Sequence, residues 1–150
     1  MLKLSEKQKQ LLLLLLIVLL GAFLRFYRLD FQSLGNDELS SWNLSNKATG
    51  ISDVIRAQAE YDINPPGYQI LLFYIIKYLG DSEFWLRFPS ALAGILSIYL
   101  IYLLGLKLLS IKEGLLAAAL TAIFWCPIYY SQEARAYSLL FLFSIISMLF

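Results

Sequence analysis

Residues 88–106 read FPSALAGILSIYLIYLLGL, a run of 19 residues without a charged side chain. Residues 114–132 and 136–150 form two further uncharged stretches, of 19 and 15 residues. An α-helix needs about 20 apolar residues to cross the hydrocarbon core of a bilayer. These stretches therefore predict membrane-spanning helices and an all-α, polytopic integral membrane protein.

The amino-acid composition narrows the classes of partner and of chemistry. Hydrophobic residues make up 59% of the chain, which excludes disorder, and 12 basic residues against 11 acidic ones give a net charge of +1. Such a chain has no overall field to attract nucleic acid, so the expected surroundings are membrane lipids. It has no histidine and one cysteine, Cys126. Disulfides within the chain, cysteine-based zinc sites and serine–histidine nucleophiles are thereby excluded.

We expect four spanning helices, over about 10–29, 84–107, 112–130 and 134–150. Lysines precede the first span and occupy the turn between the second and third, so both places are expected on the cytoplasmic side, with the amino terminus. These lysines are Lys3, Lys7, Lys9, Lys107 and Lys112. The first run is expected to be an uncleaved anchor, because no small-residue cleavage site follows it. Arg25 and Arg28 are expected to lengthen it by reaching the far interface.

Residues 30–83 then form an outer loop with helices of its own. Residues 67–80 would reach roughly 21 Å as a helix, short of a hydrocarbon core of about 30 Å. We therefore expect an interfacial or re-entrant helix there. Another surface helix is expected around residues 51–60, because Ile51, Val54 and Ile55 recur at helical spacing.

Gly114, Ala118 and Ala122 recur every four residues along the third predicted span. Small side chains at this spacing let another helix approach closely, so their expected role is packing. The chain ends at Phe150 within an apolar run. We expect it to be the amino-terminal part of a longer polytopic protein, and inactive alone as an enzyme.

Three polar clusters fall on the predicted outer side of the membrane, where the informative polar residues are those that gather on one face. They are Gly35-Asn36-Asp37-Glu38, Asp62-Ile63-Asn64-Pro65-Pro66-Gly67-Tyr68 and the segment 129–137 with Glu133 and Arg135. Each also has a purely structural interpretation. The carboxylates can begin a helix capped by Asn36, where the helix dipole favours negative charge. The prolines can mark a turn, and Glu133 and Arg135, poor partners at a spacing of two, can be interfacial anchors.

Together and in this order, the clusters resemble those of membrane glycosyltransferases with the GT-C fold. The resemblance is to family 39 in particular, which includes the protein O-mannosyltransferases and the aminoarabinose transferase of lipid A, and it covers nearly the whole chain. Its most specific part is SEFWLRFPSALAG at residues 82–94. The other parts are Asp37-Glu38, NPPGY at residues 64–68 and YSQEAR at residues 130–135.

The resemblance implies that a sugar moves, with inversion, from a polyprenyl-phosphate donor to a lipid, protein or glycan acceptor. The active site would lie on the outer face of the cell membrane. Asp37 matches the general base of the family, and Glu38 would orient the base or the acceptor. Arg135 would contact the phosphate, because a planar guanidinium can bind two oxygens, with Glu133, Asn64 and Tyr68 also binding substrate. Family members often carry Lys or His where Asn64 stands, so one cation is missing here.

This chemistry requires no cofactor, because phosphate leaves as an anion and one carboxylate can take the acceptor proton. Related oligosaccharyltransferases use a divalent metal bound by carboxylates, which Asp37 and Glu133 could supply. The alternative hypothesis is a catalytically inactive fragment, or a non-enzymatic scaffold subunit that retains the fold. The two hypotheses differ in geometry, since in the enzyme Asp37 and Arg135 must face the same cavity.

Overall fold

The computed structural model describes residues 5–61 and 64–150. In these residues all regular structure is helical, which confirms the predicted all-α class. The helices are α1 Glu6–Phe26, α2 Asn36–Asn46, α3 Ile51–Tyr61, α4 Gly67–Leu79, α5 Glu83–Leu108, α6 Ile111–Ile123, α7 Trp125–Ser131 and α8 Tyr137–Leu149. Asp62 and Ile63, which open the second polar cluster, lie outside the described residues.

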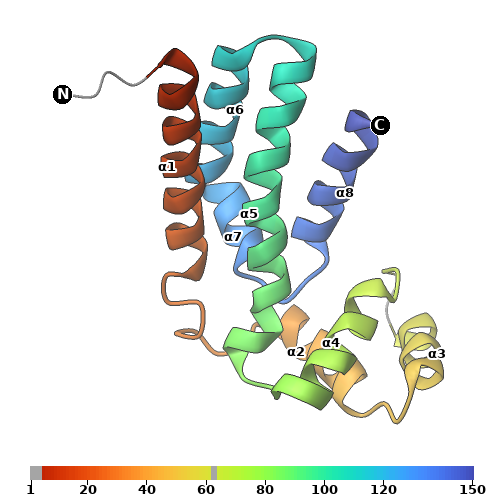
Figure 1. Cartoon of the computed structure of the whole chain (residues 1–150). Coiled ribbons are helices and arrows are strands. Elements are labelled where there is room, and N and C mark those ends of the chain that lie inside the picture. Colours follow the sequence, from red (N-terminus) through yellow and green to blue (C-terminus); the bar gives the residue numbers. More distant parts are fainter. Residues whose placement is uncertain (1–4, 62–63) are drawn as a thin grey trace.

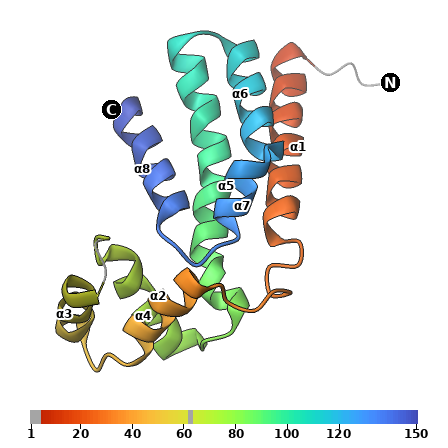
Figure 2. The same ribbon diagram turned by 180° about the vertical axis from the view of Figure 1, so that it is seen from behind.

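The helices form a bundle with a cap at one end (Figure 1). Helices α1, α5, α6 and α8 run lengthwise, whereas α2, α3 and α4 lie together at one end, here called the capped end. The view from behind shows the same arrangement (Figure 2). The start of α1, the α5–α6 turn and the end of α8 all lie away from the cap. Helices α2, α3 and α4 and the turn between α7 and α8 thus share one end of the molecule.

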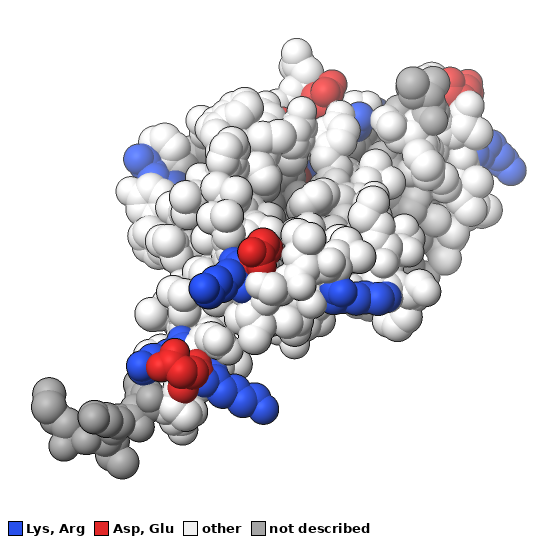
Figure 3. Space-filling model, turned by 90° about the horizontal axis from the view of Figure 1, so that it is seen from above, with Lys and Arg blue, Asp and Glu red and all other residues white. Residues whose placement is uncertain are grey.

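Two helices, α1 and α5, are long and apolar enough to cross a membrane. Helices α6 and α7 make a third candidate if they form one bent span. Helices α4 and α8 are shorter, at 13 residues each. Seen from the end opposite the cap, most of the surface is uncharged (Figure 3). These features suit a bundle surrounded by lipid.

The segment expected as the third span, 112–130, is not one straight helix. It breaks at Phe124 into α6 and α7, whose axes meet at 58°. Pro127 has no N–H to donate to the carbonyl of Ile123, so a continuous helix would lose a hydrogen bond there. In the structure Phe124 is extended and Pro127 falls in the first turn of α7, where a proline is tolerated.

Two helix ends differ from the expected span limits. Helix α1 ends at Phe26 rather than near residue 29, because Arg28 has a φ of 55°, outside the right-handed helical region. Helix α8 begins at Tyr137 rather than near residue 134. The N–H of Ala134 instead donates to the side chain of Glu38, 2.7 Å away. A turn thus replaces the expected last residues of α1, and a tertiary contact replaces the expected first residues of α8.

The small residues of α6 pack against α5 and α1, as predicted. Gly114 and Gly105 lie so close that a methyl group on Gly105 would come 2.5 Å from the Cα of Gly114. Ala118 and Ala122 are fully buried in a core with Leu14 of α1 and Ile98 of α5. The stripe therefore brings three helices into close contact.

A second core joins the cap to the bundle. It contains Tyr68 and Leu72 of α4, Leu86 of α5 and Ala134 of the α7–α8 turn. Because these buried side chains come from three separate segments, their packing fixes the positions of those segments relative to each other. Tyr68 and Ala134 belong to two of the three polar clusters.

Gly105→Ala should destabilise the α5–α6 pair by about 1–3 kcal/mol, because the added methyl group meets backbone atoms of Gly114. Thermal unfolding of the purified protein in detergent, followed by circular dichroism, measures the loss. Gly67→Ala is the matched control, since a methyl group there has nothing within 4 Å. Equal melting temperatures for the two variants would contradict the close crossing of α5 and α6.

Candidate active site

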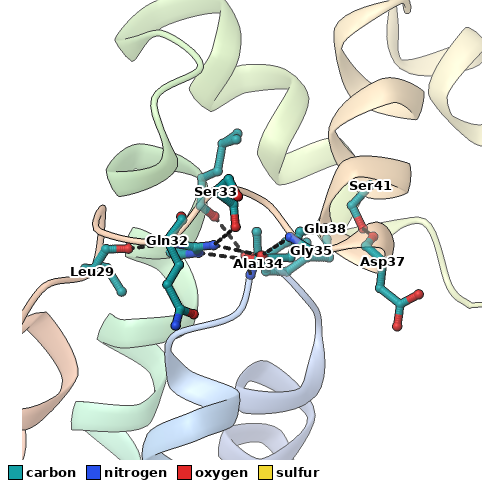
Figure 4. A network of polar contacts seen from close by, with 11 residues as sticks. Leu29, Gln32, Ser33, Gly35, Asp37, Glu38, Ser41 and Ala134 are labelled. Atoms are coloured by element: carbon teal, nitrogen blue, oxygen red, sulfur yellow. Dashed lines mark hydrogen bonds and ion pairs between the residues drawn. The ribbon is translucent and has the colours of Figure 1, made fainter.

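Glu38 of α2 and Arg87 of α5 form a buried ion pair at the capped end (Figure 4). The Nε and Nη2 atoms of Arg87 lie 2.8 Å from the Oε1 and Oε2 atoms of Glu38, respectively. The two side chains are only 6% and 7% exposed. This bidentate geometry is the strong form of the arginine–carboxylate pair, and it joins residues 49 positions apart.

The Glu38 carboxylate also accepts two backbone hydrogen bonds. The N–H of Gly35 lies 2.9 Å from Oε2, and the N–H of Ala134 lies 2.7 Å from Oε1. Burial by itself raises the pKa of Glu38, but the hydrogen bonds from Arg87, Gly35 and Ala134 outweigh it and leave the pKa below its ordinary value. With four donors, roughly all the lone-pair sites of an ionised carboxylate are occupied. Glu38 has no acceptor site left for a substrate proton.

Arg87 also organises the segment between α1 and α2. Its Nη1 atom donates to the carbonyls of Leu29 and Gln32, each 2.8 Å away, and its Nη2 atom donates to the carbonyl of Ser33 at 3.2 Å. With the two bonds to Glu38, all five N–H groups of the guanidinium are used. The most specific part of the family resemblance, residues 82–94, thus contains the side chain that fixes the start of the outer loop.

Asp37, the predicted base, points away from this network (Figure 4). Its side chain is exposed, whereas that of Glu38 is buried. The predicted cap at Asn36 is wrong by one residue, because Gly35 occupies the N-cap position and Asn36 begins the helix. A glycine has no side chain to accept a hydrogen bond, and Glu38 instead bonds back to the N–H of Gly35. A structural role in the helix start therefore accounts for Glu38 but leaves Asp37 available.

Arg135 lies against the start of α2. Its Nη1 atom donates to the carbonyl of Asp37 at 3.3 Å and to the hydroxyl of Ser41 at 3.1 Å. Asp37 and Arg135, 98 positions apart, are thus brought together at the capped end. Glu133 lies half-buried in the same turn, where its carbonyl accepts the backbone N–H of Arg135 at 2.9 Å. The side chain of Arg135 contacts α2 and not Glu133.

A cavity of about 410 Å³ lies between α4 and α8, next to Arg135. Asn64 and Tyr68 line it together with Arg135, near the starts of the two helices. Its wall along α8 is apolar and comprises Leu139, Leu140 and Phe143. A guanidinium beside an apolar wall can bind an anionic headgroup while the wall binds a hydrocarbon chain.

Tyr68 contributes its ring rather than its hydroxyl to this cavity. The hydroxyl is buried, donates to the carbonyl of Leu86 at 3.0 Å and lies 2.9 Å from the Oγ of Ser90. Burial raises the pKa of Tyr68 far above its ordinary value, so the hydroxyl stays protonated. Ser90 in turn donates to the carbonyl of Arg135 at 3.0 Å. Tyr68 therefore positions the turn that carries Arg135.

Gln69 is a polar residue of the same cavity that the sequence did not reveal. It is buried, and its Oε1 atom has no hydrogen-bond partner. A buried amide oxygen left in this state costs about 1–3 kcal/mol, which a bound ligand or water could offset. A single glutamine after NPPGY forms no pattern, so nothing in the local sequence indicated it.

Arg25 is fully buried, which corrects the prediction that it reaches the far interface. Its guanidinium donates to the carbonyl of Gly21 at 3.1 Å and to those of Thr121 and Ala122 at 2.9 and 3.2 Å. The last two carbonyls lie at the end of α6, where the break at Phe124 leaves them without helical partners. Arg25 therefore stabilises the broken helix. In the sequence, Pro127 indicated that carbonyl groups near this point would lack helical partners.

Arg25 of α1 binds the end of α6, and in the reverse sense Gln132, at the end of α7, binds the end of α1. Its Nε2 atom donates to the carbonyls of Leu24, Arg25 and Tyr27, at 3.1, 3.3 and 3.2 Å. The ends of α1, α6 and α7 are thus joined by side-chain hydrogen bonds from two directions. The turn that carries Arg135 starts from this junction.

No group of three His, Cys, Asp or Glu side chains suited to a metal ion occurs in residues 5–61 and 64–150. A divalent metal bound by Asp37 and Glu133 stays a prediction. Two carboxylates would leave most of the ligands to substrate and water, as in many magnesium sites.

Residues 64–150 match the family model of dolichyl-phosphate-mannose-protein mannosyltransferases. The match covers more than half of the chain. The chain belongs to this family. The resemblance to GT-C membrane glycosyltransferases is thereby confirmed, and the apolar helices together with the family place the chain in a membrane. No curated protein and no solved structure matches the chain.

The residues that match the glycosyltransferase family model include part of the candidate site. Arg87, Arg135 and the cavity between α4 and α8 lie within the matched residues. Asp37 and Glu38 precede them in the chain, and the contacts made by Arg87 and Arg135 bring them to the same end. Such a family acts on a sugar donor and an acceptor, so two binding regions are needed beside the reacting groups.

Glu38→Gln should destabilise the protein by about 3–5 kcal/mol at pH 7, because an amide cannot accept all four N–H groups and leaves the charge of Arg87 unpaired. The lowered pKa of Glu38 means that its contribution is fully present above the ordinary glutamate pKa of about 4.3. The contribution is lost as pH falls through the lowered value. Unfolding midpoints in detergent should therefore stay apart down to about pH 4.3 and converge for the two proteins as pH falls further.

Glu60→Gln, on the exposed face of α3, is the control and should leave the midpoint at pH 7 unchanged. A difference between Glu38→Gln and the unmodified protein that stays constant with pH would contradict the role of the ionised carboxylate.

Proposed function

We propose that the chain transfers a sugar from polyprenyl phosphate to an acceptor hydroxyl or amine at the outer face of the cell membrane, with inversion. One observation carries the proposal. Of two adjacent carboxylates, Glu38 has its acceptor sites filled by four N–H groups, whereas Asp37 is exposed beside Arg135. Asp37 is therefore the general base, and Glu38 fixes the helix start that orients it.

In the transfer step, the acceptor oxygen or nitrogen forms a bond to the anomeric carbon and gives its proton to Asp37. The bond between that carbon and the phosphate oxygen breaks, and its electron pair leaves with the polyprenyl phosphate. A phosphate is stable as an anion, so no general acid is needed. Arg135 compensates the charge that develops on the departing phosphate. Attack opposite the leaving phosphate inverts the anomeric carbon.

The cavity between α4 and α8 supports this assignment of the donor. Its apolar wall along α8 suits a prenyl chain, and Arg135 suits the phosphate. Asn64 and the amide of Gln69 lie on the same cavity and can hydrogen-bond the sugar or the phosphate. Glu133, in the turn with Arg135, is assigned to orienting the acceptor.

The orientation in the membrane follows from the lysines. Lys107 and Lys112 flank the α5–α6 turn, which lies at the end opposite the cap. If lysines mark the cytoplasmic side, the cap with Asp37 faces outward. The amino terminus is then cytoplasmic.

Asp37→Asn should lower the rate of sugar transfer by about 10²–10⁴-fold, because an amide cannot accept the acceptor proton. The measurement follows release of labelled mannose from dolichyl phosphate mannose, with protein expressed from the whole reading frame and reconstituted in vesicles. Asp30→Asn, an exposed carboxylate of the α1–α2 segment, is the matched control and should leave the rate unchanged. Undiminished turnover of Asp37→Asn would overturn the assignment of the base.

Arg135→Gln should raise the donor KM by about 10–100-fold, because a charge-assisted hydrogen bond to the phosphate is lost. Arg135→Lys should recover part of this loss, since it retains the charge but not the bidentate geometry. The same vesicle assay, run over a range of donor concentrations, measures both variants. Arg56→Gln, on the exposed side of α3, is the control and should leave the donor KM unchanged. An unchanged donor KM in Arg135→Gln would exclude Arg135 from phosphate binding.

A further inference from the structure

Gln69 of α4 has a polar side chain that the fold leaves unpaired. It is only 3% exposed, and it lines the cavity between α4 and α8. The other buried glutamine of the cap, Gln58, donates from Nε2 to the carbonyl of Asn64 at 2.9 Å. Within residues 5–61 and 64–150, the amide of Gln69 forms no hydrogen bond. Because buried polar groups are nearly always paired, an unpaired amide beside a cavity indicates a ligand.

Helix α2 holds Gln69 and Arg135 at a fixed spacing. The hydroxyl of Ser41 accepts a hydrogen bond from Arg135 at 3.1 Å, and the hydroxyl of Ser45 lies 3.0 Å from the carbonyl of Gln69. Both serines are buried. Residues four apart on an α-helix share one face and differ by about 6 Å along its axis. Arg135 and Gln69 are thus attached to α2 one helical turn apart, a spacing comparable to the width of one sugar ring.

The side chains of Arg135 and Gln69 require different chemical groups in a ligand. A guanidinium only donates hydrogen bonds, so it matches the oxygens of an ionised phosphate, which only accept them. The Oε1 atom of Gln69 also only accepts, so an ionised phosphate cannot satisfy it. A sugar hydroxyl both donates and accepts, and it can therefore bond to either end of the amide. The phosphate belongs at Arg135, and a group that carries hydroxyls belongs at Gln69.

We propose that Gln69 binds a hydroxyl of the donor sugar and thereby contributes to the choice of sugar. The inference rests on the proposed function, because that function assigns the donor to the same cavity. With the phosphate at Arg135 and the prenyl chain along α8, the sugar lies toward the start of α4. The anomeric carbon is bonded to the phosphate oxygen, so it lies at the Arg135 end of the sugar. Asp37, whose carbonyl accepts from Arg135, is at that end.

A sugar without the contacted hydroxyl would leave the buried amide unpaired in the complex. Sites that hydrogen-bond a substrate hydroxyl reject the analogue that lacks it, because their own polar groups lose a partner. Gln69 is therefore a specificity-determining residue. A merely structural role would have a different consequence, since it would weaken the binding of all donors equally.

The test measures donor binding without an acceptor, so that it does not depend on the base. Protein from the whole reading frame is placed in nanodiscs. The Kd is measured for dolichyl phosphate mannose, for its monodeoxy analogues and for dolichyl phosphate without a sugar. In the unmodified protein, loss of one hydroxyl should raise the donor Kd about 10–100-fold. In Gln69→Leu, the complete donor and that analogue should bind with the same Kd.

Three further measurements serve as controls. Gln69→Leu should leave the Kd of dolichyl phosphate unchanged, whereas Arg135→Gln should raise it about 10–100-fold. Gln32→Leu makes the same change at an exposed glutamine of the capped end outside the cavity, and it should keep every Kd of the unmodified protein. Because Gln69→Leu removes an unpaired buried amide, its thermal unfolding midpoint should be no lower than that of the unmodified protein.

The outcomes separate this inference from the proposed function. Equal binding of all deoxy donors by the unmodified protein, or selectivity that survives in Gln69→Leu, would overturn the role of Gln69 and leave the phosphate site at Arg135 intact. An unchanged Kd of dolichyl phosphate in Arg135→Gln would overturn that phosphate site. A sugar contact at Gln69 would still be seen as selectivity lost in Gln69→Leu.

Discussion

The ion pair between Glu38 and Arg87 is the contact on which the capped end depends. The Glu38 carboxylate accepts hydrogen bonds from α5, from the start of α2 and from the turn before α8. The Arg87 guanidinium also binds three carbonyls of the α1–α2 segment. Two charges buried at the edge of an apolar bundle are stable only together, because either one alone would lose its solvation without compensation. The four segments therefore keep one arrangement, and that arrangement places Asp37 beside Arg135.

Adjacent carboxylates receive different tasks because of helix geometry. Successive residues of an α-helix point about 100° apart, so Glu38 can enter the protein while Asp37 faces outward. The inward carboxylate is held ionised by its four donors, and the outward one keeps its lone pairs. Glu38 thus holds the structure together, whereas Asp37 is available for the proposed role of general base.

The bundle beneath the cap supports the turn that carries Arg135. Arg25 of α1 binds the open carbonyls at the end of α6, and Gln132 at the end of α7 binds the open carbonyls of α1. A break in a spanning helix would otherwise expose backbone groups to lipid at a cost of several kcal/mol each. The break is useful because it turns the chain toward the cap before α8 begins. Packing of small residues between α5 and α6 supplies the rigid base.

Local patterns in the sequence correctly predicted the all-α class and helices near residues 51–61, 67–79 and 83–108. They could do so because apolar runs and helical periodicity depend only on neighbours in the chain. The same patterns also indicated the polar residues of interest. Arg25 was predicted at an interface and is buried. Gln69 was not noticed, and residues 112–130 were expected as one spanning helix but break into α6 and α7. Each of these depends on partners elsewhere in the fold, up to about a hundred positions away in the case of Arg25. The sequence alone shows which groups carry charge, whereas only the tertiary structure decides which charges are neutralised by a partner and which stay free to react.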